Sequence, residues 1–459
     1  MASLIGGSAI QHLAQDIDTN KINHKAKANG PNLAPKSRAL DMVSKLEPSR
    51  GPVHEHWWDL TSPQLASMLE EAGYPVGRQL EILLFYNHTI PEADSSRNWQ
   101  SLLPVTVVPL EYSWKWDTAC ESPEVRLTIE AFGDLSGTRA DPLNQAAAIE
   151  LLHRTKGVLP DLNQTWINHF CSTLFDEDKD KYMEEAQSGT GMRLQSTMLV
   201  AFEFGRTSTS TKTYLTPRRL GQQGFARLPE YMPAIQALGP SRALDTLMDF
   251  LHTSPEGVEL TPFGLSFDNV EPTSSRLKFY FASPNTSYNS LREVLTLGCR
   301  ISKANFNIEE KIRTIHSLAK ALMVAPDNLP DDEHISARAQ PQSLSSASDP
   351  VTSDIVKERT SLLAGYQYYF DIAPGADLPD IRFYAPIRKE LINDRGVAAA
   401  VTDWMKAQGR GKFCDNYVRM LEGMAGERGL SKCHGLHSFI GCLIRRDGEL
   451  DVTSYLLPG

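Results

Sequence analysis

The stretch Arg276-Leu277-Lys278-Phe279-Tyr280 decides the fold class of this chain. It follows a turn-like segment, 272–275, and has the composition of a β-strand. Residues two apart in a strand share a face, so Arg276, Lys278 and Tyr280 point one way. The alternate residues are apolar and must be the covered face. On an open sheet the cationic face would meet water, but inside a barrel two adjacent cations would need an anion to offset their desolvation.

The pairing of a cation with a tyrosine two residues later recurs at Lys212 and Tyr214 and at Arg382 and Tyr384. A fourth strand-like segment alternates polar and apolar residues and begins at Arg126. A solvated sheet face would explain any one of these segments. Four together indicate one shared anion site, and the tyrosines indicate a cationic or π-rich group beside that anion.

The composition excludes several classes of protein. The chain has 459 residues and a formal net charge of −10, so it does not resemble a nucleic-acid-binding protein with a basic surface. Its six cysteines have no zinc-binding spacing, which predicts a reduced, cytoplasmic protein. No apolar run approaches the roughly 20 residues that cross a bilayer, and no membrane partner is expected.

Changes in composition along the chain indicate its domain organisation. Residues 1–48 are polar and predict a partly disordered tail with one short helix at 37–46. Residues 49–459 predict a single domain, interrupted at 331–354 by a segment rich in Ser, Pro, Asp and Ala that we expect to be a disordered surface loop. Thr61-Ser62-Pro63 predicts a helix start and Gly73 a helix end.

Between these segments, pairs of strands alternate with helical segments, and the block repeats three times. A parallel βαβ arrangement would need strands that are apolar on both faces, whereas these strands alternate. The sequence therefore predicts an α+β protein with an antiparallel sheet.

The ordered set of motifs resembles the fungal aromatic prenyltransferases of the dimethylallyltryptophan synthase type over roughly residues 50–459. The motifs are Trp57-Trp58 with Ala72-Gly73-Tyr74, Pro109-Leu110-Glu111, Val125-Arg126, Gly137-Thr138 with Asp141-Pro142-Leu143-Asn144, Lys212-Thr213-Tyr214, Arg276-Leu277-Lys278-x-Tyr280, Leu297-Gly298 and Tyr384-x-Pro386. Each motif alone is weak, but their order and spacing are specific. The resemblance implies a closed ten-stranded antiparallel β-barrel ringed by helices and built from repeated ααββ units, the ABBA or PT barrel.

The resemblance also implies a reaction and a set of site residues. An allylic diphosphate would lose its diphosphate, and the carbocation would attack an electron-rich ring. Glu111 would bind the acceptor and help to remove a proton. No metal or cofactor is expected, with Mg²⁺ or Ca²⁺ at most stimulatory, and the arrangement is compatible with a homodimer. The implied diphosphate ligands are Arg126, Lys212, Arg276, Lys278 and Arg382, and the implied allyl-shielding residues are Tyr214, Tyr280 and Tyr384.

Three departures from the family pattern bear on specificity. Members that prenylate tryptophan carry a lysine near the position of Leu199, where this chain has no base. Arg382 replaces a glutamine, which we expect to add positive charge to the diphosphate site. The C-terminal strand 439–444 lacks two tyrosines, and Cys442 and Ile444 predict a thinner aromatic shield and room for a longer donor.

These departures, together with the pair Trp114 and Trp116, favour a polycyclic phenol of polyketide origin as acceptor and dimethylallyl or geranyl diphosphate as donor. Tryptophan, a tryptophan-containing cyclic dipeptide or another indole stays open as the alternative. A non-catalytic barrel that carries a hydrophobic ligand and a phosphate-ester hydrolase are the other classes considered. We interpret the acidic segment 176–180 as a solvated helix start and expect no zinc site at Cys433, His434 and His437.

Overall fold

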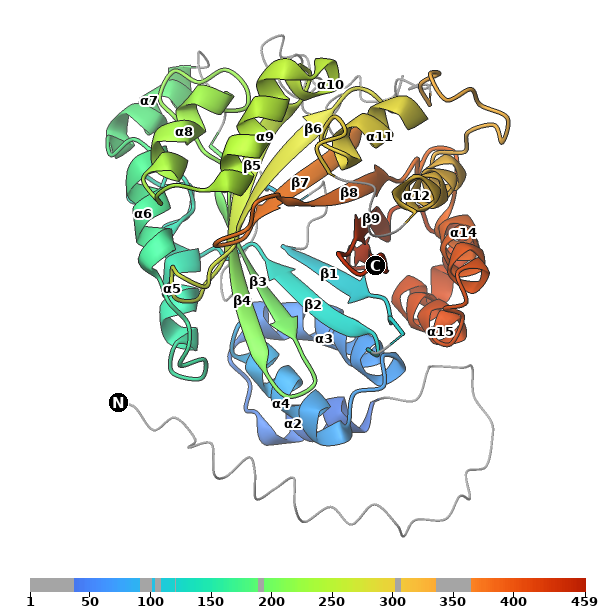
Figure 1. The fold of residues 1–459 in the computed structure, drawn as a ribbon. Helices are drawn as coiled ribbons and strands as arrows, with labels where there is room; N and C mark the ends of the chain where they lie inside the picture. Colours follow the sequence, from blue (N-terminus) through green and yellow to red (C-terminus); the bar gives the residue numbers. More distant parts are fainter. Residues whose placement is uncertain are drawn as a thin grey trace.

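The computed structural model describes residues 37–90, 101–103, 109–119, 121–188, 194–301, 307–335 and 365–459 (Figure 1). Ten strands close into one antiparallel barrel in the order β1-β10-β9-β8-β7-β6-β5-β4-β3-β2. The expected barrel is therefore confirmed. The strands are β1 (Leu110–Lys115), β2 (Glu124–Ile129), β3 (Met198–Phe204), β4 (Thr209–Leu215), β5 (Thr261–Asp268), β6 (Leu277–Ser283), β7 (Tyr366–Ile372), β8 (Asp380–Pro386), β9 (His437–Ile444) and β10 (Leu450–Leu456).

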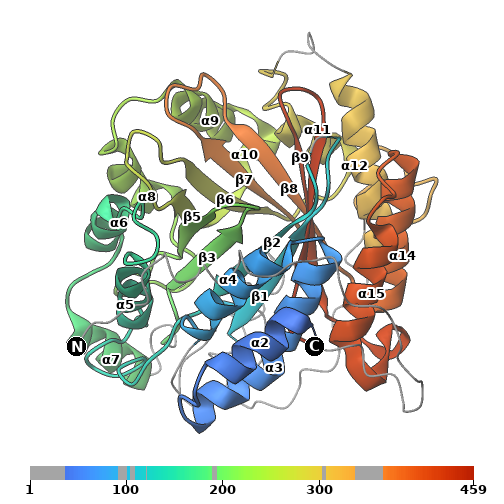
Figure 2. The same ribbon diagram turned by 90° about the horizontal axis from the view of Figure 1, so that it is seen from below.

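Helices surround the barrel, and Figures 1 and 2 show them on the outside of the strands. Each pair of neighbouring strands follows at least two helices along the chain, so the repeated ααββ organisation is confirmed. The helices are α2 (Arg38–Leu46), α3 (Pro52–Glu71), α4 (Val76–Asn87), α5 (Ala146–Thr155), α6 (Thr165–Leu174), α7 (Lys179–Ser188), α8 (Leu228–Gln236), α9 (Arg242–Thr253), α10 (Pro255–Val258), α11 (Tyr288–Leu295), α12 (Ile308–Leu322), α14 (Asp394–Ala407) and α15 (Cys414–Ala425).

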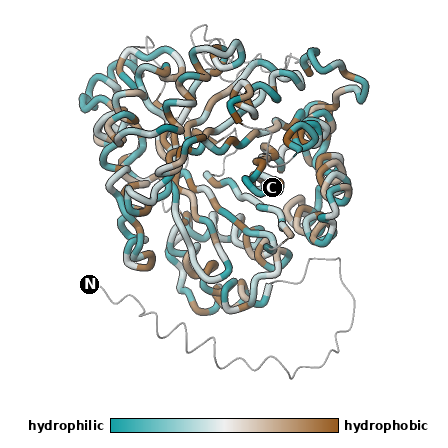
Figure 3. Tube along the Cα trace, in the orientation of Figure 1, coloured by the Kyte–Doolittle hydropathy of each residue, from teal (hydrophilic) through white to brown (hydrophobic). Residues whose placement is uncertain are grey.

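The outer face of the barrel wall packs against these helices. The ring of Trp114 in β1 lies 5.7 Å, and that of Trp116 just after β1 lies 4.6 Å, from the ring of Tyr417 in α15. Hydrophobic and hydrophilic residues alternate along the surrounding helices (Figure 3), as expected for helices that pack one face on the barrel and expose the other to water. The main core thus lies between the barrel and its helices, and the inner face of the wall carries charged and aromatic side chains.

One expected boundary is wrong. Helix α3 begins at Pro52 and continues through Pro63, so Thr61-Ser62-Pro63 is not a helix start. The Thr61 hydroxyl donates to the carbonyl of Trp57, four residues earlier, instead of capping a new helix. Both Thr61 and Trp57 are buried, and packing against the barrel holds the helix together across the proline. Gly73, with a φ of +73°, ends the segment as expected.

Two expectations fall partly outside the described residues. Helix α2 is present where the short helix at 37–46 was predicted, while residues 1–36 of the tail lie outside the described part. Of the predicted loop, only 331–335 is described, and there Asp331 pairs with Arg313 and Ile335 is buried. Within the described residues, no helix has the length and apolar character needed to cross a membrane.

Candidate active site

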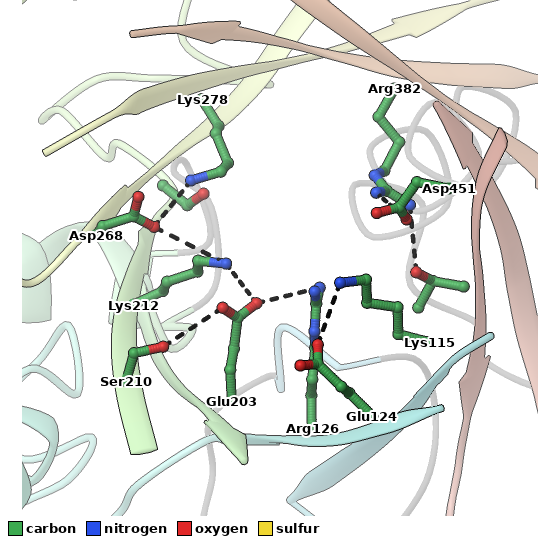
Figure 4. A network of polar contacts seen from close by, with 12 residues as sticks. Lys115, Glu124, Arg126, Glu203, Ser210, Lys212, Asp268, Lys278, Arg382 and Asp451 are labelled. Atoms are coloured by element: carbon green, nitrogen blue, oxygen red, sulfur yellow. Dashed lines mark hydrogen bonds and ion pairs between the residues drawn. The ribbon is translucent and has the colours of Figure 1, made fainter. Parts of the chain in front are cut away.

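A layer of charged side chains projects from the strands into the barrel lumen (Figure 4). Side chains along a strand alternate between the two faces of the wall, and Lys212 of β4 pairs with Asp268 of β5, while Lys278 of β6 pairs with Asp371 of β7. Asp268 Oδ1 lies 3.8 Å from Lys212 Nζ and 3.0 Å from Lys278 Nζ. The structure therefore brings these two predicted cations to one point in the lumen.

Glu203 of β3 links a third predicted cation, Arg126, to Lys212. Its Oε1 lies 3.1 Å from Arg126 Nη1 and also accepts a hydrogen bond from Lys212 Nζ. Burial alone would raise the pKa of Glu203, but Arg126 and Lys212 hold it well below its usual range. Burial lowers the pKa of Lys212 to about 8, although Glu203 favours the charged form.

Arg382 and Arg276 complete the predicted set. Arg382 Nη2 lies 2.6 Å from Asp451 Oδ1, and its Nε donates to Tyr369 Oη at 3.0 Å. Despite burial, Arg382 lowers the pKa of Asp451 to about 2. Arg276 lies at the rim with 44% of its side chain exposed, and Asp371 Oδ2 is 3.2 Å from its Nη1.

The carboxylates of this layer were not predicted. Four of them, Glu203, Asp268, Asp371 and Asp451, accompany the five predicted cations, so the layer is close to neutral. The extra positive charge expected from Arg382 is offset by Asp451. A signal was present, because Asp371 and Asp451 share a strand face with a nearby tyrosine in the way that the cations do.

An aromatic layer adjoins the charged one. The ring of Tyr280 lies 6.0 Å from that of Tyr214 and 6.5 Å from that of Tyr384, so the three predicted tyrosines are brought together. Two further tyrosines were missed: Tyr369 lies 5.4 Å from Tyr280, and Tyr455 lies 5.5 Å from Tyr384. Together they make a wall of phenol rings that adjoins the cations.

Strand β9 lines this layer with different residues from those expected. Its register pairs Gly441 with Tyr384 and Leu443 with Arg382, so these two residues face the lumen. Cys442 pairs with the outward-facing Phe383, and the expectation that Cys442 and Ile444 thin the shield is wrong. A Cβ on Gly441 would lie 3.2 Å from the Tyr455 ring and 3.4 Å from the Tyr384 ring. The space beside the tyrosines therefore depends on Gly441.

Glu111 of β1 also faces the lumen, but it stands apart from the cations. Ser113, two residues along, pairs with Arg126, whereas Glu111 pairs with Thr128. Burial raises the pKa of Glu111 from 4.5 to about 7, opposed by a hydrogen bond that Ser438 Oγ donates to Oε2 at 3.2 Å. A carboxyl with such a pKa can accept a proton near neutral pH.

The three residues that suggested the acceptor do not lie on one face of the barrel wall. Trp114 and Trp116 face α15 and do not line the lumen. Leu199 pairs with Tyr214 and does face the lumen, so the position of the missing lysine is an apolar part of the wall.

Among the residues that the structure describes, no group of three or more His, Cys, Asp or Glu side chains is arranged to hold a metal ion.

Comparison with known proteins agrees with this geometry. The family model described as tryptophan dimethylallyltransferase matches residues 54–420. Xanthone prenyltransferase A of Emericella nidulans is 56% identical over 445 residues, which cover 95% of this chain and 99% of the relative. Prenyltransferase asqH1 of the same species is 56% identical, with 99% and 98% covered.

Among solved structures, AnaPT from Neosartorya fischeri superposes with a TM-score of 0.71 at 19% identity, covering 92% of this chain and 97% of AnaPT. That likeness supports the barrel fold. The family match and the two 56% identical relatives support the activity as well. The chain therefore belongs to the tryptophan dimethylallyltransferase family and is an aromatic prenyltransferase of the dimethylallyltryptophan synthase type.

Proposed function

We propose that this enzyme transfers a dimethylallyl or geranyl group from its diphosphate to a ring carbon of a polycyclic phenol. The observation that carries the proposal is the buried Glu111 carboxyl, which interacts with Tyr214 of the tyrosine wall and lies away from the charged layer. Such a carboxylate can accept a hydrogen bond from a phenol O–H, which makes the ring more nucleophilic.

The charged layer supports the donor half of the reaction. Arg126, Lys212, Lys278 and Arg382 surround one part of the lumen (Figure 4) and would bind the diphosphate, with Arg276 at the rim. As the C–O bond breaks, these fixed cations stabilise the negative charge that develops on the leaving diphosphate. No metal ion is required for that role.

The tyrosines support the next step. The faces of Tyr214, Tyr280 and Tyr384 can stabilise the allylic carbocation electrostatically, and their bulk keeps water away from it. Tyr369 and Tyr455 extend the same wall. The ring carbon then attacks the cation, and the ring proton leaves to restore aromaticity, with Glu111 as the group that helps to remove it.

A phenol is favoured over an indole for two reasons. A relative at 56% identity is named for xanthones, which are fused tricyclic aromatics. The apolar Leu199 also offers no second base, and a phenol already presents an acidic O–H to Glu111. The family model, by contrast, is named for tryptophan, so an indole is the acceptor to test against.

Competition between acceptors tests the proposal. A polycyclic phenol and a tryptophan derivative at equal concentration, each with dimethylallyl and geranyl diphosphate, report the ratio of kcat/KM directly. We expect the phenol to be consumed faster. A tenfold preference for the tryptophan derivative would overturn the phenol assignment, and binding of both ligands without any product would point to a carrier.

The role of Glu111 is tested in the same assay. Glu111→Gln should lower kcat by about 100-fold, the usual scale for a general acid–base group, and leave the affinity for inorganic diphosphate unchanged. Turnover close to that of the unmodified enzyme would remove Glu111 from the mechanism.

A further inference from the structure

A buried polar cluster lies on the outer side of β9, where the reaction proposed above makes no use of it. His437 Nδ1 lies 2.7 Å from Asp394 Oδ1, and His437 Nε2 lies 2.8 Å from the Tyr417 hydroxyl. The three side chains come from β9, the first turn of α14 and α15. All three residues are at most 2% exposed. We call them the Asp394 clamp.

The clamp fixes the backbone at the start of β9. The Asp394 carboxylate accepts the backbone N–H of Leu436 at 3.1 Å and that of His437 at 3.0 Å, in addition to the imidazole bond. Burial disfavours its charge, but the hydrogen bonds from His437 hold the pKa of Asp394 below its usual value. One ionised side chain therefore holds two consecutive residues of the chain.

The next residue is Ser438. Gly441 and Leu443 face the lumen, so strict alternation would turn Ser438 outward, but the pairing of β9 with β10 shifts register between Tyr455 and Leu456, and this irregularity lets Ser438 face the lumen. Its hydroxyl donates to Glu111 Oε2 at 3.2 Å. Within the described part of the chain this is the side-chain hydrogen bond that Glu111 receives. Any displacement of the backbone at His437 would move the Ser438 hydroxyl and break that contact.

We propose that Ser438 is a positioning residue that keeps Glu111 ionised and oriented towards the acceptor, and that the Asp394 clamp holds Ser438 in place. The inference rests on the proposed function of Glu111. It adds a chain of contacts from α14 and α15, outside the barrel, to the acceptor site inside it.

The surroundings of Glu111 make this hydrogen bond effective. Among the described groups, no cation lowers the pKa of Glu111, and burial raises this pKa to about 7. Tyr214 is the described titratable group that interacts with it electrostatically, and burial keeps that phenol neutral by raising its pKa. Glu130, on the same face of the neighbouring β2 segment, is itself held by Ser101 and Ser196. The Ser438 hydroxyl is therefore the local group that favours the carboxylate.

The first test is the pH dependence of kcat/KM for the full-length enzyme with saturating dimethylallyl diphosphate and a varied acceptor. Ser438→Ala should shift the acidic limb of the kcat/KM profile to higher pH by about one unit, because a lost hydrogen bond to a charged group raises its pKa by about that much. Activity should then fall about tenfold at pH 6 and much less at pH 8. Ser438→Thr keeps the hydroxyl and should restore the limb. An unmoved limb in Ser438→Ala, or a threonine variant that behaves like alanine, would overturn the proposal.

The second test asks whether the clamp acts through Ser438. Asp394→Asn should move the limb in the same direction, but should add no further shift in the Ser438→Ala background. If Asp394→Asn does not fold, Tyr417→Phe perturbs the clamp less, because it leaves the bond between Asp394 and His437 and removes the hydroxyl that contacts His437 and Ser454. If Asp394→Asn shifts the acidic limb equally in the unmodified enzyme and in the Ser438→Ala variant, the clamp does not act through Ser438.

Asn393→Ala is the matched control. Asn393 precedes Asp394 and caps α14 by accepting the N–H of Gly396, so the variant loosens the same helix start without touching His437. It should lower the Tm and leave the acidic limb of the kcat/KM profile in place.

Glu111→Gln distinguishes a failure of the proposed role of Glu111 from a failure of the role of Ser438. If that variant keeps the acidic limb, the proposed role of Glu111 is wrong, whereas loss of the limb combined with an unmoved Ser438→Ala profile refutes only the role of Ser438.

Discussion

Glu203 and Arg126 face each other across the neighbouring strands β3 and β2, with 3.1 Å between Glu203 Oε1 and Arg126 Nη1. The same oxygen accepts from Lys212. A carboxylate thus occupies the position between two cations that we propose for a diphosphate oxygen. Donor binding must therefore compete with an anion of the protein itself.

This relationship predicts the effect of Glu203→Gln. Removing the negative charge should strengthen the binding of inorganic diphosphate at least about tenfold, because the ligand no longer competes for Arg126 and Lys212. The unliganded variant should have a lower Tm, since Arg126 loses its carboxylate partner and Lys212 keeps only the more distant Asp268, and diphosphate should restore it. Isothermal titration calorimetry and thermal melts measure both effects.

Glu124→Gln is the control for that experiment, because Glu124 carries the same charge but pairs with Lys115 at 3.1 Å. Its effect on diphosphate affinity should be much smaller. Weaker diphosphate binding by Glu203→Gln would mean that Glu203 orients the cations for the ligand rather than competing with it.

The affinity for the donor should depend on pH through Lys212. Burial lowers the pKa of Lys212 to about 8, so the free enzyme loses this positive charge as the pH rises above that value. The KM for dimethylallyl diphosphate should rise between pH 8 and 9.5. Lys212→Arg keeps its charge over this range and should flatten the profile. The same rise in KM in the arginine variant would assign the titration to another group.

Activity should survive the removal of divalent metal ions. Five side-chain cations converge on the proposed diphosphate site and can stabilise the leaving group themselves. Excess EDTA should leave kcat within about twofold, allowing for weak stimulation by Mg²⁺ or Ca²⁺. Abolition of turnover by EDTA and its recovery with Mg²⁺ would contradict this prediction.

Gly441→Ala tests the aromatic layer. The added Cβ would lie 3.2 Å from the Tyr455 ring and 3.4 Å from the Tyr384 ring, so one ring must move. We expect kcat/KM to fall about tenfold with dimethylallyl diphosphate and further with geranyl diphosphate, whose chain needs more room. Cys442→Ala, a change on the outer face of the same strand, is the control. Equal activity of Gly441→Ala with both donors would show that this part of the wall does not contact the prenyl chain.

The sequence was most informative where a strand has one polar and one apolar face. In β4, β6 and β8 the cation and the tyrosine two residues later share the polar face, so their direction follows from the period of a strand. For Glu111 the family resemblance implied the role, and the register of β1 places it on the lumen face. The shared face of each cation and its tyrosine needed no knowledge of the neighbouring strands.

Prediction failed where both faces of a strand are similar. In β9, Gly441 and Cys442 are flanked by apolar residues on each side, and only pairing with β8 shows which of them faces the lumen. Tyr369 was missed for the same reason, because β7 carries aromatic residues on both faces and is buried throughout. The carboxylate partners were missed because the pairing of opposite charges depends on neighbours that lie far apart in the sequence, such as Arg382 and Asp451.

Closure of the barrel by its last strand sets the order in which the enzyme can become active during its synthesis. Strand β10 lies between β1 and β9, and the indole of Trp116 donates to Ser454 across 338 positions of sequence. Because β10 also supplies Asp451 and Tyr455, a nascent chain that lacks it has two open strand edges and an incomplete site. Such a long-range closure is slow, so catalytic competence should appear only after β10 has been synthesised and has paired with β1.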